Sequence, residues 1–563
     1  MDGGVAPGRR HHEEIASTAW AAQQVGEGVD VRTPRTNLMQ AFVALLVIAL
    51  LAACAPAVED GATGDGAPSA PAARPAAAAA RTADTTPAAD RLVVALEVDV
   101  PGFDPRRQHN VRSSELVGVI LEPLVTLERD FSLRPRLATG WEVADEGRRL
   151  TLRLREGVTF HDGRPFTAED VRFTIETGLA SDETGAVRLH LSEVTRVETP
   201  DAATVVLHAE NPTGGLLVAL ASVPIIPAGS GRDFDARPIG TGPFAFVRHD
   251  VGSSLLVERF DGYWGPTAGV PAVEFRVLER STDRATALAR GNAHVSQSSW
   301  DTDEERRLEN DRNVNVERLA GTAHQYLAIN AGRPPFDDPD VRRALNHLIP
   351  RERIVADVYR GRALAGVSML APSMPWFDPD TPVFAYDVAR ARELVAASGA
   401  DFDRTYTVLT NDNPFRNATA ETLVGAFAQV GMRAQLEVAA FSTFLQRIRD
   451  GDFDVHLLGM GGAHNVARLL DQYTQETSMF NRAGFSDPEV AAMLSAAAAL
   501  DPSSPEAIAL YRAVANRVVA FSAHAFIIYD VAVGASRSEV EGWGPHPVPA
   551  LAYQDLHLVQ LGR

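Results

Sequence analysis

The stretch from Leu137 to Val171 constrains the fold more than any other part of the sequence. Leucines alternate with Thr and Arg over residues 150–155, which is the period of a strand with one buried face and one solvated face. An Asp-Glu-Gly turn precedes this strand, and Gly147 in that turn can adopt a positive φ at little steric cost. Thr167-Ala-Glu-Asp170 then carries the hydroxyl group and the early acids of a helix start. The stretch therefore predicts a β-hairpin followed by a helix.

Further motifs follow this hairpin in a fixed order along the chain. They are F-H-D-G-R-P-F-T-A-E-D-V at 160–171, G-T-G-P-F at 240–244, E-R-F-D-G-Y-W-G at 258–265 and P-F-D-D-P-D-V-R-R-A-L at 335–345. Together with the hairpin they resemble the signature of the family 5 extracytoplasmic solute-binding proteins of ABC importers, which bind peptides, nickel chelates or oligosaccharides. The resemblance spans about Arg91 to Leu558.

This resemblance implies an α/β chain with the two-lobed periplasmic-binding-protein-like fold of class II, in its large three-domain type, with a ligand cleft between the lobes. The predicted lobe I comprises 91–329 and 522–563, with an inserted subdomain at about 129–232, and lobe II comprises 330–521. The strand Gln325–Asn330 resembles the first crossing between lobes and puts Asn330 near a hinge. We expect two lobes joined by crossing strands, and not a single continuous sheet.

The first 90 residues predict a leader and a tether. Residues 1–53 combine a polar extension with an apolar run, Ala41 to Leu51, which is too short for an ordinary spanning helix and resembles a signal peptide placed late. Initiation at Val31 or a long natural n-region would each explain that position. Leu51-Ala-Ala-Cys54 resembles a lipobox and predicts lipidation at Cys54, the alternative being an incidental or buried cysteine. Residues 54–90 are rich in Ala, Pro, Gly and Thr, which predicts a disordered tether with a reach on the order of 30 Å.

Composition excludes several classes of protein. The formal net charge is −20 over 563 residues and lysine is absent, which disfavours nucleic-acid binding. Hydrophobic residues make up 45% of the chain, as expected for a globular protein and not for a membrane protein with several spans. Cys54 is the only cysteine, so an intrachain disulfide or a Cys-based zinc cluster cannot form.

One residue pair could suggest catalysis. His161 and Asp162 could indicate a metal ligand or a general base, but their place in a turn favours a role in packing and backbone hydrogen bonding. The nucleophile and zinc motifs of hydrolases, such as G-x-S-x-G and H-E-x-x-H, do not occur in a credible context. We therefore expect neither an enzyme nor a bound cofactor or metal, and we interpret Arg342 as structural.

The candidate ligand contacts come from the resemblance. In the family, the loop after the first strand and the loop that holds Trp300 face the cleft, and so does the segment after the strand 453–458. The candidates are His109, Ser114, Trp300, Met460, His464, Asn465 and Arg468. For Trp300, ordinary packing in the protein core is an equally good interpretation. For His109, an ordinary position in a surface loop is equally good.

The segment after Gly459 departs from the pattern of peptide-binding relatives, in which a Trp and then an Asp hold the peptide's α-ammonium group. Here Met460 replaces the aromatic residue, and no acid occurs until Asp471. A buried ammonium without a carboxylate would lose several kcal/mol, so His464, Asn465 and Arg468 suit a neutral polar or anionic ligand. The alternative is that Asp471 serves as the clamp after all.

The predicted function is that of a monomeric, lipid-anchored binding protein outside the cytoplasmic membrane. It would capture a small solute, such as a peptide, oligosaccharide, opine or metal chelate, and deliver it to the permease subunits of an ABC transporter. A ligand-sensing lipoprotein without transport has the same fold and stays open as an alternative, and an extracytoplasmic hydrolase is the third.

Overall fold

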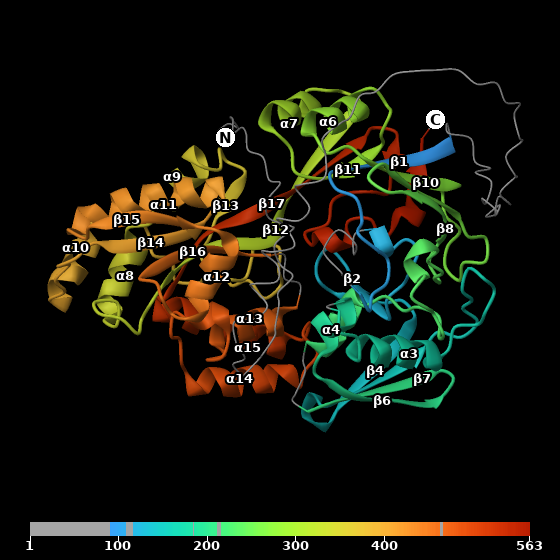
Figure 1. The fold of residues 1–563 in the computed structure, drawn as a ribbon, viewed down its shortest axis with the longest axis horizontal. Helices are drawn as coiled ribbons and strands as arrows, with labels where there is room; N and C mark the ends of the chain where they lie inside the picture. The colour runs from blue at the N-terminus through green and yellow to red at the C-terminus, as the bar shows by residue number, and fades with distance from the viewer. Residues whose placement is uncertain (1–89, 108–115, 184, 211–214, 462–464, 563) are drawn as a thin grey trace, which may run out of the picture. The chain divides into compact units, whose positions relative to one another are not determined.

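The computed structural model describes residues 90–107, 116–183, 185–210, 215–461 and 465–562. Within these residues, eleven strands form one mixed sheet in the order β15-β14-β16-β12-β17-β11-β1-β10-β9-β8, with β13 paired to β17 (Figure 1). The strands are β1 (Arg91–Leu96), β8 (Phe244–Asp250), β9 (Ser254–Arg259), β10 (Ala272–Val277), β11 (Val295–Gln297), β12 (Val314–Ile329), β13 (Ala363–Ala365), β14 (Tyr406–Asn411), β15 (Ala434–Ala439), β16 (Val455–Met460) and β17 (His524–Arg537).

Two long antiparallel strands, β12 and β17, join the two halves of this sheet. They pair from Val314↔Arg537 to Ala328↔His524, while β16 adds to the last residues of β12 and β11 adds to the last residues of β17. The sheet therefore runs through both halves, with shifts in the β12–β17 register after Ala320 and after Gln325. Our expectation that the sheet would not be continuous is wrong, because the crossing strands are paired over almost their whole length.

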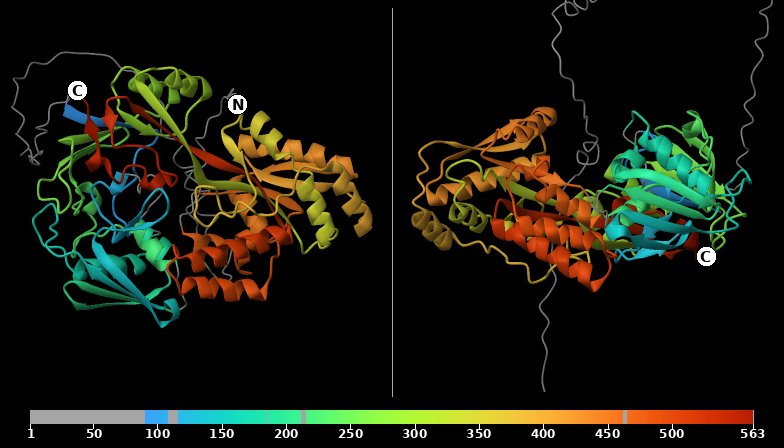
Figure 2. Two further views of the ribbon diagram at one scale, coloured as in Figure 1. Left: turned by 180° about the vertical axis from the view of Figure 1, so that it is seen from behind. Right: turned by 90° about the horizontal axis from the view of Figure 1, so that it is seen from below.

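The halves differ in the layers that cover them. Residues of α8 (Pro339–His347), α10 (Val388–Ser398) and α11 (Pro414–Phe427) pack on β14 and β16 in one apolar core. Helices α13 (Val466–Thr474), α14 (Pro488–Ala498) and α15 (Pro505–Phe521) pack against one another (Figure 2) and contribute to a second core. Two further cores flank β1 and β10, one of which includes α6 (Ser281–Ala289) and α7 (Thr302–Glu309). The remaining helices of the second half are α9 (Arg351–Asp357) and α12 (Phe441–Arg449).

A separate antiparallel sheet, in the order β4-β5-β7-β6, carries the predicted hairpin. Its strands are β4 (Ala138–Ala144), β5 (Arg149–Leu154), β6 (Val194–Asp201) and β7 (Thr204–Ala209), and its core also takes up α3 (Ala168–Leu179), α4 (Ala186–Leu191) and α5 (Leu216–Ala219). Gly147 has φ +85°, and Thr167 and Asp170 form a reciprocal capping box at the start of α3. Both local predictions are confirmed. A short ribbon of β2 (Val125–Leu127) and β3 (Leu133–Pro135) leads into this sheet.

Asn330, the predicted hinge residue, directly follows β12. Its side-chain amide donates to the carbonyls of Gly451 and Phe453 at 3.2 and 3.0 Å, and its Oδ1 accepts the backbone N–H of Gly332 at 3.2 Å. These bonds fix the direction of the chain where it leaves the crossing strand. The end of β12 at Ile329 and the start of β17 at His524 lie close to the predicted lobe boundaries, which stay a prediction.

No helix in the described ranges is long and apolar enough to cross a membrane. The same ranges contain no group of three or more His, Asp or Glu side chains arranged to hold a metal ion. Cys54 and the predicted leader and tether lie outside the described residues.

Candidate functional site

The signature motifs meet one another in space. His161 is partly buried beside the G-T-G-P-F loop, where its Nε2 lies 2.9 Å from the carbonyl oxygen of Gly242 and its Nδ1 accepts the backbone N–H of Gly240 at 3.3 Å. This pair of partners requires a neutral ring that is protonated at Nε2. Burial lowers the pKa of His161 to about 4, and both ring nitrogens are used. His161 therefore has a structural role, as interpreted from the sequence.

Asp162 also stabilises the turn through hydrogen bonds. Its two oxygens accept the backbone N–H of Arg164 at 3.1 Å and the Nε of the same residue at 2.7 Å. The interpretation of the His-Asp pair as turn residues is confirmed. Arg342 is structural too, since it donates to the carbonyl oxygens of Phe521, Phe336 and Asp337.

Two other signatures converge on a buried carboxylate, Glu122. Its oxygens accept hydrogen bonds from Thr241 Oγ1 at 3.0 Å, Tyr263 Oη at 2.9 Å and Trp264 Nε1 at 2.8 Å. Arg136 Nη1 lies 3.7 Å from Glu122 Oε1. Burial raises the pKa of Glu122, against the opposing effect of Arg136 and the three donors. Four partners around one acid explain why the G-T-G and G-Y-W motifs occur together, a connection that sequence reasoning missed.

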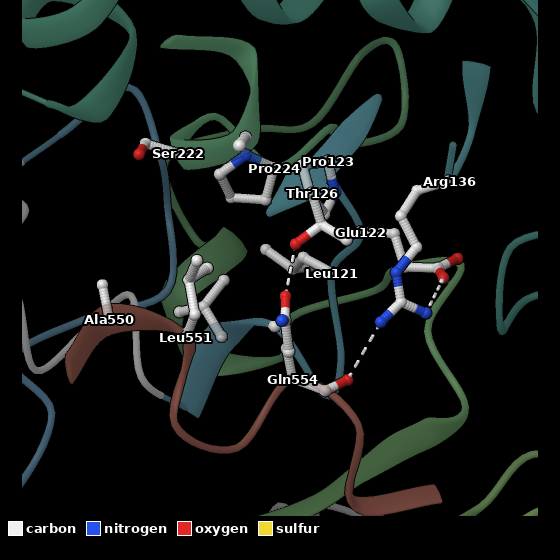
Figure 3. Close-up of a pocket in the computed structure, with 13 residues that line it drawn as sticks. Leu121, Glu122, Pro123, Thr126, Arg136, Ser222, Pro224, Ala550, Leu551 and Gln554 are labelled. Carbon is white, nitrogen blue, oxygen red and sulfur yellow. Dashed lines mark hydrogen bonds and ion pairs between the residues drawn. The ribbon is translucent and has the colours of Figure 1, made fainter. Parts of the chain in front are cut away.

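A cavity of about 40 Å³ opens beside this carboxylate (Figure 3). It lies where three distant parts of the chain meet, and its lining residues are Val117, Gly118, Leu121, Glu122, Pro123, Thr126, Arg136, Ala221, Ser222, Pro224, Ala550, Leu551 and Gln554. Such a volume can hold one or two waters or a small apolar group. Because most of the wall is apolar, the cavity suits a methyl or ethyl group.

The polar side chains at the cavity are held by other protein groups. Gln554 accepts a hydrogen bond from Thr126 Oγ1 and donates to the carbonyl of Leu127 at 3.0 Å. Arg136 donates to the carbonyl of Gln554 at 3.3 Å and pairs with Asp555. Sequence reasoning found none of these residues, because their partners lie more than four hundred positions apart and no local pattern links them.

The predicted ligand contacts fall in different places. His109, Ser114 and His464 lie outside the described residues, although the segment with His109 and Ser114 immediately precedes the residues 116–121 that supply one wall of the cavity. Met460 is the last residue of β16 and is 3% exposed within an apolar core. Asn465 is the N-cap of α13 and Arg468 lies in its first turn.

Trp300 lies away from the cavity, in the core that includes α6 and α7. Its side chain is 2% exposed, and the Arg284 guanidinium lies 5.5 Å from its ring centroid. Trp376 is also buried and donates from Nε1 to the carbonyl of Pro502 at 2.8 Å. Neither ring presents a face to solvent, and a ligand contact of Trp300 stays a prediction.

The fold defines a class of protein. The described chain has the two-lobed α/β fold of periplasmic solute-binding proteins, and it matches the structure of HbpA2 from Haemophilus parasuis with a TM-score of 0.78 at 20% identity, over 84% of this chain and 100% of that chain. The family model described as "Bacterial extracellular solute-binding proteins, family 5 Middle" matches residues 132–479. The chain therefore belongs to the family 5 bacterial extracellular solute-binding proteins.

Two relatives in Escherichia coli strain K12 are similar over most of their length. The dipeptide-binding protein is 25% identical over 412 residues, which cover 66% of this chain and 76% of the relative. The glutathione-binding protein is 25% identical over 499 residues, which cover 84% of this chain and 95% of the relative. The recognition made from the signature motifs is thus confirmed, and the chain is a solute-binding protein.

Proposed function

We propose that this chain is the lipid-anchored substrate-binding protein of an ABC importer. It captures a peptide-like or other small polar solute outside the cytoplasmic membrane and delivers it to the permease. The observation that carries the proposal is the family match over residues 132–479 together with the two-lobed fold. Similarity to dipeptide-binding and glutathione-binding proteins supports a solute of peptide size.

The anchor follows from Leu51-Ala-Ala-Cys54 after an apolar run. One acyl chain binds a membrane only marginally, so a diacylated cysteine is needed for stable attachment. The Cys54→Ala variant, expressed in a bacterial host, should lose both lipid labelling and membrane association. Unchanged labelling and association would show that Cys54 is not the anchor.

The charged groups near α13 indicate which kind of solute to expect. The first acid after Met460 is Asp471, which lies on the second turn of α13 beside Arg468 and Gln475. Burial raises the pKa of the Asp471 carboxyl, and repulsion from Glu193 adds to this increase. A carboxyl whose charge is disfavoured in this way is a weak partner for a ligand ammonium. We therefore propose a neutral polar or anionic solute, such as a peptide whose amino terminus is not the recognised group.

A thermal-shift panel tests this proposal. Di- to pentapeptides, glutathione, glycans, opines and metal chelates are compared at increasing concentration, and a ligand present at a hundred times its Kd should stabilise the protein by about 2.7 kcal/mol. We expect peptides and their N-acetylated forms to bind equally well. Tight binding of ordinary peptides that N-acetylation abolishes would show that an ammonium clamp exists.

A further inference from the structure

Two side chains at the start of α13 bind backbone carbonyl groups of the other predicted lobe. Asn465 Nδ2 donates to the carbonyl oxygen of Gly215 at 2.9 Å. Arg468 Nη1 donates to the carbonyl oxygen of Leu189. Leu189 lies near the end of α4, whose last carbonyls have no partner within the helix. Arg468 thus caps a helix of one lobe from a helix of the other.

The approach at Gly215 is close. A Cβ added at that position would lie 2.5 Å from Asn465 Oδ1 and 2.9 Å from Asn465 Cγ. Both polar atoms of the Asn465 amide have partners: Nδ2 donates to Gly215, and Oδ1 accepts the backbone N–H of Arg468 at 3.2 Å. Glycine at 215 is what allows the Asn465 side chain to come this near to the backbone.

Charge makes Arg468 important to the same contact. Glu193, two residues after α4, and Asp471, on α13, interact electrostatically with each other and with Arg468. Repulsion from Glu193 raises the pKa of Asp471, while Arg468 lowers it. Without the guanidinium, the carboxylates of Glu193 and Asp471 would repel each other, and this repulsion would favour separation of the two lobes.

We propose that Asn465 and Arg468 form a closing latch, in which they act as positioning residues that hold the two lobes together and set solute affinity without contacting the solute. This inference rests on the proposed binding function. In a protein that binds its solute in the closed form, the apparent Kd is inversely proportional to the closed fraction. Contacts made only on closing therefore raise affinity for every solute equally.

The first test needs no solute. The full chain carrying Cys54→Ala has no other cysteine, so Gly215→Cys with Asn465→Cys supplies a single pair. The distance of 2.9 Å from an added Cβ at 215 to Asn465 Cγ is close to the separation of about 3 Å between Cβ and the far sulfur in a disulfide. We expect rapid intramolecular cross-linking with diamide, and none for the control pair Gly215→Cys with Gly399→Cys.

Arg468→Met, added to the cross-linking variant, keeps the aliphatic stem and removes the charge. We expect cross-linking to slow roughly tenfold, because a hydrogen bond from a charged donor is lost and the two carboxylates are exposed to each other. Equal rates with and without Arg468→Met, or no cross-link at all, would overturn the latch.

The second test measures glutathione affinity by calorimetry. Asn465→Asp keeps the oxygen that caps α13 but loses the N–H that reaches Gly215, so the helix is preserved while the latch is broken. We expect its Kd to rise roughly fivefold to tenfold, and Gly215→Ala to do the same with little further effect in the double variant. A Kd within twofold of wild type would refute the latch. If wild type does not bind glutathione, that result counts against the proposed solute class, and the cross-linking rates alone decide the latch.

Discussion

The crossing strands contain a buried histidine cluster whose acid sensitivity can be predicted. His324 of β12, His456 of β16 and His524 of β17 surround the Tyr326 ring, with centroid distances of 6.1, 6.1 and 5.6 Å. His324 Nε2 lies 2.6 Å from Tyr473 Oη, and His524 Nε2 lies 3.0 Å from the carbonyl of Phe480. Within the described residues neither nitrogen of His456 has a hydrogen-bond partner.

Burial lowers the pKa of His456 to about 3 from its ordinary 6.5, and His524 adds to the effect. The unfolded chain therefore binds a proton at a higher pH than the folded chain does. The resulting contribution to stability is complete above pH 6.5 and is lost as the pH falls from 6.5 towards 3. At pH 5 the loss is about 2 kcal/mol for one such histidine. Burial also lowers the pKa of His324 and of His524. The three histidines together should therefore lower the free energy of unfolding by about 6 kcal/mol between pH 7.5 and pH 5.

His456→Leu isolates one of these contributions. At pH 7.5 the free energy of unfolding of the variant should lie within about 1.5 kcal/mol of the wild-type value, because the side-chain volume is similar and no hydrogen bond is removed. Urea unfolding followed by circular dichroism at pH 7.5 and 5.0 should then show that the variant loses about 2 kcal/mol less than wild type on acidification.

The matched control is Phe453→Leu, whose ring centroid lies 4.7 Å from that of His456. It removes packing but no titratable group, so it should lower stability equally at both pH values. If His456→Leu and wild type lose the same free energy between pH 7.5 and 5.0, the imidazole is not held neutral by burial and the reasoning fails.

Substitutions at three further positions test the scaffold, each by urea unfolding at pH 7.5. Glu122→Leu should cost about 4 kcal/mol, because it leaves three buried donors without their acceptor and removes one of the two carboxylates that face the buried Arg136; a loss below 1 kcal/mol would show that the carboxylate is dispensable. Asn330→Ala removes three hydrogen bonds at the end of β12 and should cost about 3 kcal/mol, whereas Asn330→Asp should recover part of this loss through its acceptor oxygen. Gly240→Ala places a Cβ 2.0 Å from the carbonyl oxygen of Ile120 and should cost about 3 kcal/mol; wild-type stability would mean that the loop moves freely.

Local structure was predictable wherever neighbouring residues determine it. The hairpin at 138–154 and the capping box at Thr167 follow from adjacent side chains, and so does the left-handed Gly399 after α10. The length of β12 did not follow. The sequence predicted a strand at 325–330, but the strand begins at Val314, because β17, more than two hundred positions away, supplies its hydrogen-bond partners.

The candidate site was predictable only in part, for the same reason. The segment around Asn465 was predicted as a solute contact, and its contacts with the carbonyls of Gly215 and Leu189 were not predictable, since these partners contribute only backbone groups. His294 likewise has a partner far away in the sequence: its Nδ1 accepts the backbone N–H of Val93 at 2.8 Å.

The polar atoms of the signature motifs are engaged within the protein, and this limits where the solute can be recognised. Both nitrogens of His161 bond the loop at 240–242, and the donors of Thr241, Tyr263 and Trp264 all converge on Glu122. A group that already satisfies a buried partner can bind a solute only by leaving that partner unpaired, at a cost of about 1–3 kcal/mol. The residues that make the family recognisable are therefore poor candidates for solute contacts. Solute specificity must come from positions outside these motifs, which is why the family match establishes the fold and the class of protein without identifying the solute.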